Sequence, residues 1–305
     1  MNNINKPIFV LFHGFGSSRL WFEYGYLGTD KLKKLNFINE LKKIGDVYSM
    51  QSNFFNIDYY FRNENKTERQ KWIKIYKKYN PHTNDIDFNL EDLDYDVICK
   101  KVYDELINKF GIINDKTLVP ICHSYGSDIG IMFSKMYKNK CSFCVLLDGN
   151  PHALDLQKEI YNKFEKKNKK MVDNKFNNNV KLNKILNKIK NIKDTDIVNK
   201  EIRNVFKMIS HNSDVYKIKH FIKILPIKTL FFRSIYIDST KAPNENWNNW
   251  AVREQEYVTK TNNSDNFKFI FFVNAPHFLW YDQKVSDEII SQIKQMIESF
   301  EKSYI

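Results

Sequence analysis

The segment TLVPICHSYG, residues 117–126, constrains the fold of this 305-residue chain more than any other part of the sequence. Its apolar first half is typical of a buried strand, and residues 127–138 after it have the pattern of a helix. Ser124 would then lie in a sharp turn between strand and helix, with its hydroxyl exposed and helix N–H groups behind it. A small residue, Gly126, lets strand and helix pack around such a turn. The segment therefore predicts a nucleophilic serine.

Short apolar runs alternate with helical patterns over much of the chain. This alternation predicts the α/β fold class, a mostly parallel central sheet with crossover helices on both faces. No internal repeat indicates a solenoid. The strands are expected at 8–12, 47–50, 117–123, 141–147, 227–232 and 267–273. The clearest helices are expected at 93–110, 127–138 and 285–300.

A basic stretch interrupts the sheet pattern. Residues 153–225 contain 18 Lys and Arg against 8 Asp and Glu, which is +10 of the chain's net charge of +12. Amphipathic helical patterns around 182–192 and 202–209 predict a helical cap over 153–225, inserted into a core made of 1–152 and 226–305.

The charge of this cap has two interpretations. It can attract an anionic substrate or surface, or it can be the solvated face of ordinary amphipathic helices, which the composition favours. No nucleic-acid-binding motif accompanies the charge, so we expect no specific nucleic-acid partner.

Two further features limit the class of protein. Cys141 and Cys144 form a C-x-x-C, but within the strand-like CSFCVLL they face opposite sides, and no second Cys/His pair follows. We therefore expect core cysteines, with no metal and no cofactor. The start of the chain lacks the apolar stretch of a signal peptide, and no segment approaches the roughly 18 apolar residues of a membrane span. These features predict a cytoplasmic protein.

Three motifs elsewhere in the chain are consistent with a catalytic serine. His13-Gly14-Phe15-Gly16 follows the first strand, where a loop N–H can complete an oxyanion hole. His277 lies in the loop NAPHF after the last strand, and Asp238 follows the strand at 227–232 and could orient it. The order Ser–Asp–His is that of one group of catalytic triads.

With these motifs the chain, from Pro7 to its C-terminus, resembles the α/β-hydrolases. VLFHGFGSSRLW resembles their first strand and oxyanion loop, VPICHSYGSDIG their nucleophile turn, and FFVNAPHFLWYD their histidine loop. The resemblance implies that Ser124 attacks a carbonyl and that His277 takes the proton. It also implies that the N–H groups of Phe15 and Tyr125 bind the oxyanion, in a loop shaped by residues 13–16.

The chain departs from the family in two ways, in the motif G-x-S-x-G and in the position of the acid. Cys122 replaces the first glycine, and cysteine is small enough for the turn to form. The acid more often lies three residues after a glycine, whereas here Asp238 lies four residues after Ser234. Asp148, after the preceding strand, is the alternative acid, and another carboxylate such as Glu245 remains open. We expect Asp238.

The function predicted is hydrolysis of a small carboxylic ester or thioester through an acyl-enzyme. The same triad also supports amide, C–C or acyl-transfer chemistry, and the fold can serve as an inactive binding protein. Aromatic residues gather in 54–90 and 241–266, which we expect to be long loops that form a lid or pack beneath one.

Overall fold

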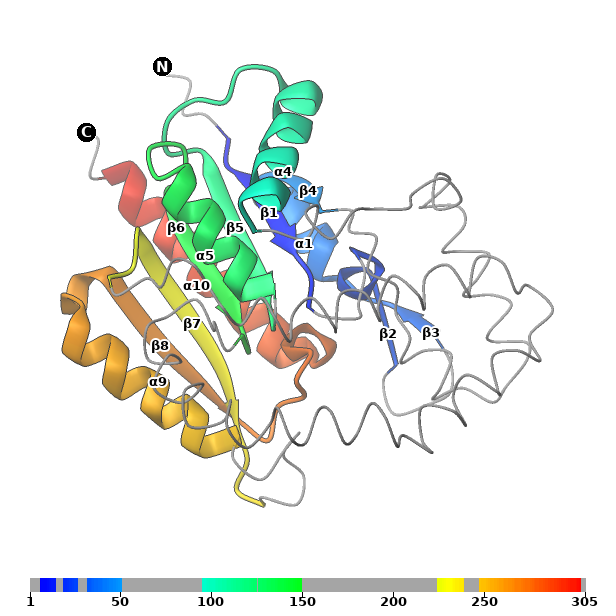
Figure 1. The fold of residues 1–305 in the computed structure, drawn as a ribbon. Helices are drawn as coiled ribbons and strands as arrows, with labels where there is room; N and C mark the ends of the chain where they lie inside the picture. Colours follow the sequence, from blue (N-terminus) through cyan, green and yellow to red (C-terminus); the bar gives the residue numbers. More distant parts are fainter. Residues whose placement is uncertain are drawn as a thin grey trace, which may run out of the picture.

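The computed structural model describes residues 6–14, 19–26, 32–50, 95–124, 126–149, 224–238 and 247–302. Their main feature is a six-stranded sheet with the strand order β4-β1-β5-β6-β7-β8, in which every neighbouring pair is parallel (Figure 1). The strands are β1 (Ile8–Phe12), β4 (Asp46–Ser49), β5 (Leu118–His123), β6 (Phe143–Leu147), β7 (Lys228–Ile235) and β8 (Phe267–Val273).

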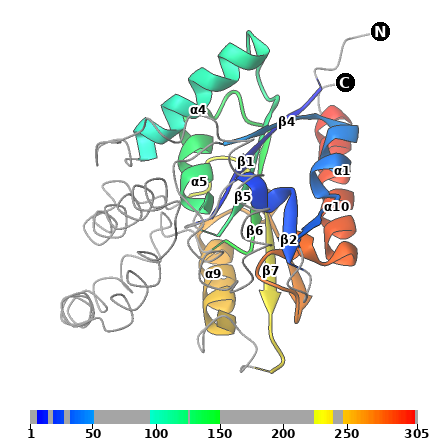
Figure 2. The same ribbon diagram turned by 90° about the vertical axis from the view of Figure 1, so that its right-hand side faces the viewer.

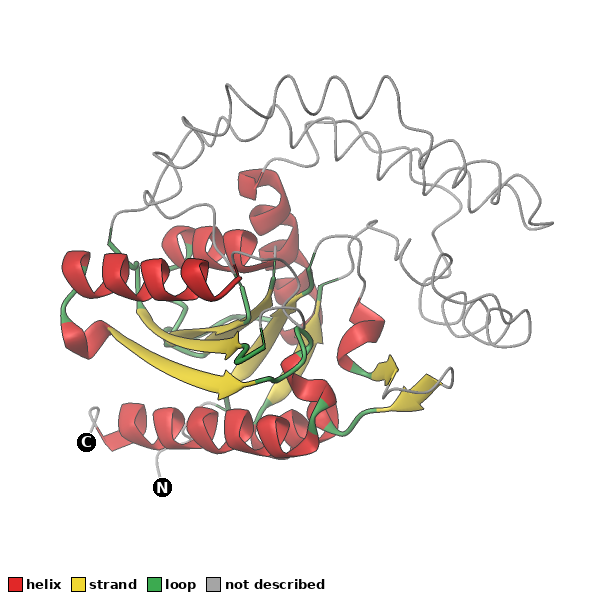
Figure 3. Cartoon of the chain, turned by 90° about the horizontal axis from the view of Figure 1, so that it is seen from below, coloured by secondary structure: helices red, strands yellow, loops and turns green. Residues whose placement is uncertain are grey.

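Helices cover both faces of this sheet (Figures 2 and 3). On one face lie α4 (Tyr95–Phe110), α5 (Gly126–Met136) and α9 (Trp247–Thr261), and on the other lie α1 (Phe37–Ile44) and α10 (Gln283–Lys302). The smaller elements are the antiparallel strands β2 (Tyr24–Tyr26) and β3 (Leu32–Lys34) and the 3-10 helices η1 (Arg19–Phe22), η4 (Ser264–Asn266) and η5 (Leu279–Tyr281).

The apolar strands build one core on each face of the sheet. Val10 and Phe12 of β1 pack in the core beneath α4, α5 and α9, whereas Phe9 and Leu11 pack in the core beneath α1 and α10. A strand covered on both faces needs apolar residues at every position, which is why IFVLF does not alternate. The expected α/β class, a mostly parallel sheet with helices on both faces, is confirmed.

The segment 241–266 differs from the prediction, because α9 occupies most of the stretch expected to be a loop. Ala251, Glu254 and Val258 share the buried face of this helix. Because one of the buried positions is the charged Glu254, the apolar residues of this segment do not recur at a clear helical spacing. The sequence pattern therefore did not predict the helix. The aromatic segment 54–90 lies outside the described residues.

The insert was predicted between β6 and β7. These two strands are direct neighbours, with Val145 opposite Leu230, so no described strand lies between them in the sheet. Residues 151–223 lie outside the described residues, and the basic cap at 153–225 stays a prediction. Among the residues that the structure describes, no helix is long and apolar enough to cross a membrane.

Candidate active site

The turn after β5 presents Ser124 in a conformation that serine rarely adopts. Its φ is +51°, in the left-handed region, directly where the strand ends. The Ser124 N–H donates to the carbonyl of Leu147 at the end of β6 (3.3 Å), and its carbonyl accepts from the N–H of Ser127 (3.0 Å). α5 begins two residues after the serine. The observed strand–turn–helix is therefore the one that the sequence predicts, with local strain at the serine.

Glycines allow the chain to pass close to this turn. A Cβ on Gly126 would lie 2.4 Å from the carbonyl oxygen of Phe12, so only glycine lets α5 start against β1. A Cβ on Gly14 would lie 3.0 Å from the Cβ of Ser124, which places the start of the predicted oxyanion loop beside the serine. The predicted oxyanion donors Phe15 and Tyr125, and Gly16 of the loop, lie outside the described residues.

Cys122 occupies the position of the first glycine of the turn motif, and α5 accommodates it with a glycine of its own. A Cβ on Gly130 would lie 1.9 Å from the Sγ of Cys122. Burial raises the pKa of the Cys122 thiol well above its ordinary value, so it stays protonated as a core residue. Cys141 and Cys144 of the C-x-x-C are buried as well.

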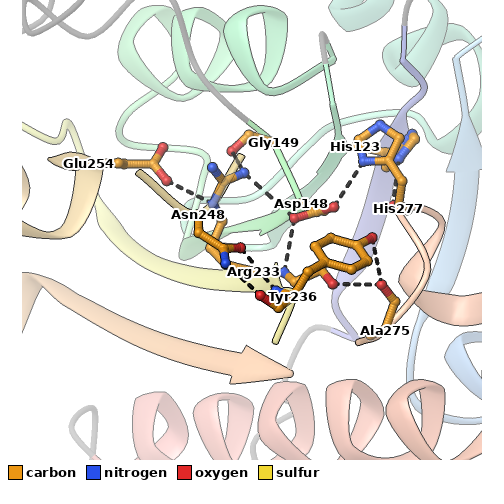
Figure 4. Close-up of polar contacts among 10 residues, drawn as sticks. His123, Asp148, Gly149, Arg233, Tyr236, Asn248, Glu254, Ala275 and His277 are labelled. Atoms are coloured by element: carbon orange, nitrogen blue, oxygen red, sulfur yellow. Dashed lines mark hydrogen bonds and ion pairs between the residues drawn. The ribbon is translucent and has the colours of Figure 1, made fainter. Parts of the chain in front are cut away.

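His277 makes a hydrogen bond with a buried carboxylate, as Figure 4 shows. Its Nδ1 lies 2.9 Å from Oδ2 of Asp148, and the exposed fractions of the two side chains are 27% and 0%. A carboxylate only accepts, so Nδ1 carries the proton, and Nε2 keeps a lone pair that can accept one. This is the arrangement that a general base requires.

The two acids considered from the sequence are placed very differently. Asp148 follows β6 with a φ of +47°, and it is the residue that faces His277. Asp238 is exposed, three residues beyond the end of β7. The geometry therefore favours Asp148 and reverses the preference for Asp238. The physical reason is that β6 is the immediate neighbour of β5, so its end lies beside the nucleophile turn.

The loop that carries His277 is fixed at two carbonyl groups. The carbonyl of Ala275 accepts from the hydroxyls of Ser234 (2.6 Å) and Tyr236 (2.8 Å), both at the end of β7. The carbonyl of His277 itself accepts from Nε2 of His123, at 3.1 Å. The imidazole is thus held beside the residue that directly precedes Ser124, and the two imidazole rings are 4.6 Å apart between centroids.

The buried histidines next to the serine are kept neutral. Burial lowers the pKa of His123 well below its ordinary value, and the nearby His277 lowers it further. Burial likewise lowers the pKa of His13 to about 4, against a smaller opposing effect of its hydrogen bond with the carbonyl of Gly14. A neutral ring can donate through one nitrogen only, so each is suited to fixing a carbonyl rather than to exchanging protons at neutral pH.

Solved structures share this arrangement of elements, although no family model and no curated protein matches the sequence. A candidate lipase from Acinetobacter baumannii AYE is similar with a TM-score of 0.52 and 14% identity, over 98% of this chain and 85% of that one. MenH from S. aureus is similar with a TM-score of 0.51 and 12% identity, over 98% and 96%. The structures found are α/β-hydrolase fold enzymes. This chain has the α/β-hydrolase fold.

A group of buried charged side chains lies behind Asp148, and the sequence analysis did not predict it. Arg233 of β7 and Glu254 of α9 are each 1% exposed, and Nε of the arginine lies 3.0 Å from Oε2 of the glutamate. Nη1 of the arginine lies 3.7 Å from Oδ1 of Asp148. The available signal was the charged residue inside the apolar strand KTLFFRSI. An arginine buried in a central strand needs a partner, and the sequence does not say which.

Among the described residues, no group of three or more His, Cys, Asp or Glu side chains is arranged to hold a metal ion. The described residues offer a strained serine, an imidazole and a buried carboxylate.

Proposed function

We propose that the protein is a serine hydrolase that cleaves a carboxylic ester or thioester through an acyl-enzyme. The observation that carries the proposal is the hydrogen bond between Nδ1 of His277 and Oδ2 of Asp148, beside the left-handed turn at Ser124. The similarity to α/β-hydrolase fold enzymes supports hydrolysis in general, while the ester class rests on the site residues alone.

The proposed reaction begins with proton transfer. Nε2 of His277 takes the proton of the Ser124 hydroxyl as its oxygen attacks the substrate carbonyl, and the imidazolium then gives that proton to the leaving alcohol or thiol. Water, deprotonated by the same imidazole, next attacks the acyl-enzyme. The bond to the Ser124 oxygen then breaks, the serine takes the proton back from the imidazolium, and the acid is released. Asp148 holds the tautomer of His277 and stabilises the imidazolium. Backbone N–H groups of Phe15 and Tyr125 are the proposed oxyanion donors.

A fluorophosphonate probe tests the nucleophile. We expect the purified protein to be labelled at one serine and to hydrolyse a short-chain p-nitrophenyl ester. Ser124→Ala removes the attacking oxygen, so labelling should vanish and kcat should fall about 10⁶-fold. Ser264→Ala, at an exposed serine of η4, is the matched control and should retain both activities. A wild-type protein that resists every acyl probe contradicts the proposal.

The leaving group and the acceptor of the acyl group are tested by product analysis. Matched oxygen esters, thioesters and amides of one acyl group should give the free acid in water, with the ester and thioester turned over faster than the amide. Transfer of the acyl group to an added alcohol or amine in preference to water would assign acyl transfer instead.

A further inference from the structure

A buried guanidinium lies behind the proposed acid, on the side away from His277 (Figure 4). The two oxygens of Asp148 are used differently. Oδ2 faces His277, whereas Oδ1 accepts from the backbone N–H of Ser234 at 2.9 Å and lies 3.7 Å from Nη1 of Arg233. The carboxylate is therefore held between an imidazole on one side and a cation with a backbone donor on the other.

Contacts with β7 also fix the backbone on either side of Asp148, one of them made by the Arg233 side chain and the other by the main chain. Nη1 of Arg233 donates to the carbonyl of Gly149, the residue after the acid, at 2.6 Å. The residue before Arg233 in β7, Phe232, accepts at its carbonyl from the N–H of Asp148, at 2.7 Å. The positive φ of Asp148 is a strained conformation, and these contacts bind the turn to β7.

Glu254 approaches the same guanidinium from α9. Its Oε2 lies 3.0 Å from Nε of Arg233, so one cation serves two buried carboxylates. Burial raises the pKa of Glu254 to about 7, Arg233 opposes the rise, and the negative charge of Asp148 adds to it. Asp148, unlike Glu254, has the N–H of Ser234 and the imidazole of His277 as further partners.

Such a group does not contribute to stability in the way that an apolar core does. Removing three charged side chains from water costs several kcal/mol per ion, and well-packed apolar residues of similar volume are often as stable or more so. Arg233, however, lies beside the carboxylate of Asp148 and bonds the carbonyl of the next residue, Gly149.

We propose that Arg233 is a positioning residue that balances the charge of Asp148 and holds its carboxylate against His277, and that Glu254 fixes the orientation of the guanidinium. This inference rests on the proposed function for its kinetic consequence. Its structural content, the hydrogen bond between Asp148 and His277, can be measured without turnover.

The experiment compares Arg233→Met, Arg233→Lys and Arg253→Met. The last is the matched control, because Arg253 is exposed on α9, next to Glu254. For a p-nitrophenyl ester we expect Arg233→Met to lower kcat about 10²-fold with KM changed less than about twofold, since the acid orients the base and does not bind the substrate. Arg233→Lys should recover about tenfold of that loss, because lysine restores the positive charge but lacks the forked N–H donors of the guanidinium. Arg253→Met should be unchanged.

The role of Glu254 is tested by two substitutions. Glu254→Gln keeps a polar oxygen beside Nε of Arg233, so kcat should stay within about threefold of the wild type, whereas Glu254→Ala removes this neighbour of the guanidinium and should lower kcat about tenfold. Equal effects of the two variants would contradict a role in orienting Arg233. Glu256→Gln, at an exposed position of the same helix, is the control.

Proton NMR gives a readout that a merely structural role would not change. A histidine–carboxylate hydrogen bond gives a far-downfield Nδ1–H resonance, assigned here by its loss in His277→Gln. It should disappear or move upfield in Arg233→Met and persist in Arg233→Lys and Arg253→Met. Circular dichroism confirms that each variant is folded, and Arg233→Lys serves if the Met variant is not.

The outcomes separate the two proposals. A folded Arg233→Met protein with unchanged kcat and an unchanged downfield resonance overturns the positioning role while the hydrolase proposal stands. A wild-type protein that neither reacts with acyl probes nor hydrolyses esters overturns the hydrolase proposal. In that case the loss of the resonance in Arg233→Met would still support the positioning of Asp148 by Arg233.

Discussion

Ser124 and Asp148 directly follow two neighbouring strands, β5 and β6, and adopt nearly the same left-handed backbone, with φ of +51° and +47°. The surroundings of the two turns differ. Glycines lie close to the serine turn: a Cβ on Gly126 would lie 2.4 Å from the carbonyl oxygen of Phe12, and one on Gly14 would lie 3.0 Å from the Cβ of Ser124. Charged and hydrogen-bonding side chains surround the aspartate turn, with Arg233 on the side away from His277. Close packing acts at both turns, since a Cβ on Gly149 would lie 1.6 Å from Oγ of Ser127, but the buried charged side chains contact the aspartate turn.

This difference decides what each turn can do. Close packing around Ser124 fixes the backbone and leaves the side chain half-buried, so that the hydroxyl can meet a substrate. Polar contacts around Asp148 keep a fully buried carboxylate in place, where it can act only through His277. The predictions below test this contrast.

The largest expected effect concerns the acid. Asp148→Asn keeps the shape of the side chain but favours the wrong tautomer of His277, so kcat for an ester should fall about 10³- to 10⁴-fold. Asp238→Asn, at the exposed acid expected from the sequence, should change kcat less than about twofold. Steady-state kinetics on the two purified variants makes the comparison. A greater loss in Asp238→Asn would return the role of acid to that residue.

The next-largest effect concerns the pH dependence of the free energy of unfolding, through Glu254 near the turn at Asp148. The folded-state pKa of Glu254 is raised from 4.5 to about 7, so folding takes up a proton between these values. The free energy of unfolding should therefore fall as the pH rises through this window, on the order of 3 kcal/mol for this group. Glu254→Gln should remove that fall.

Urea unfolding at several pH values from 4.5 to 7.5 measures the difference between wild type and Glu254→Gln. His13 acts in the opposite direction, because its lowered pKa causes a loss of stability as the pH falls from 6.5 towards 4. This contribution is common to both proteins and cancels in their difference. A difference independent of pH would show that Glu254 is ionised in the folded protein throughout the range.

The packed turn should respond to volume instead of pH. Gly130→Ala brings a methyl group against the Sγ of Cys122 and should destabilise the protein by about 1–3 kcal/mol. The double variant Cys122→Gly/Gly130→Ala removes the clash, so the two changes should be coupled, with the double variant more stable than the sum of the singles predicts. Thermal unfolding of the four proteins measures this coupling, and additivity would show that the two sites do not share space.

The smallest effect concerns the histidine loop. Tyr236→Phe removes one of the two hydroxyls that donate to the carbonyl of Ala275, while Ser234 continues to donate. We expect a loss of about 1 kcal/mol in stability and less than about threefold in kcat. A much larger kinetic effect would show that the tyrosine, and not the serine, holds the loop.

The sequence was sufficient for the elements that packing defines. The strand before Ser124, the small residues after it and the position of His277 after the last strand all follow from local patterns, and the structure has β5, α5 and the loop after β8 at these places. Some packing constraints act on residues close together in sequence, such as Cys122 and Gly130, and short motifs record these.

The polar contacts could not be predicted in the same way. Asp148 lies 129 residues from His277 and 86 from Ser234 in sequence. The sequence around Asp148 or Glu254 does not indicate which residue each carboxylate contacts, and Asp238 also follows the end of a strand. The helix α9 was not predicted, because the buried Glu254 interrupts the helical spacing of its apolar residues. Only the order of strands in the sheet shows which strand ends are neighbours.

The dependence of the site on β8 has a consequence for protein synthesis. His277 follows β8, which comes after α9 in the chain, so a growing polypeptide that has emerged only as far as α9 has the serine turn without the proposed base. Without that base, the Ser124 hydroxyl is an ordinary alcohol. In the proposed mechanism, ester cleavage therefore requires that β8 is paired with β7.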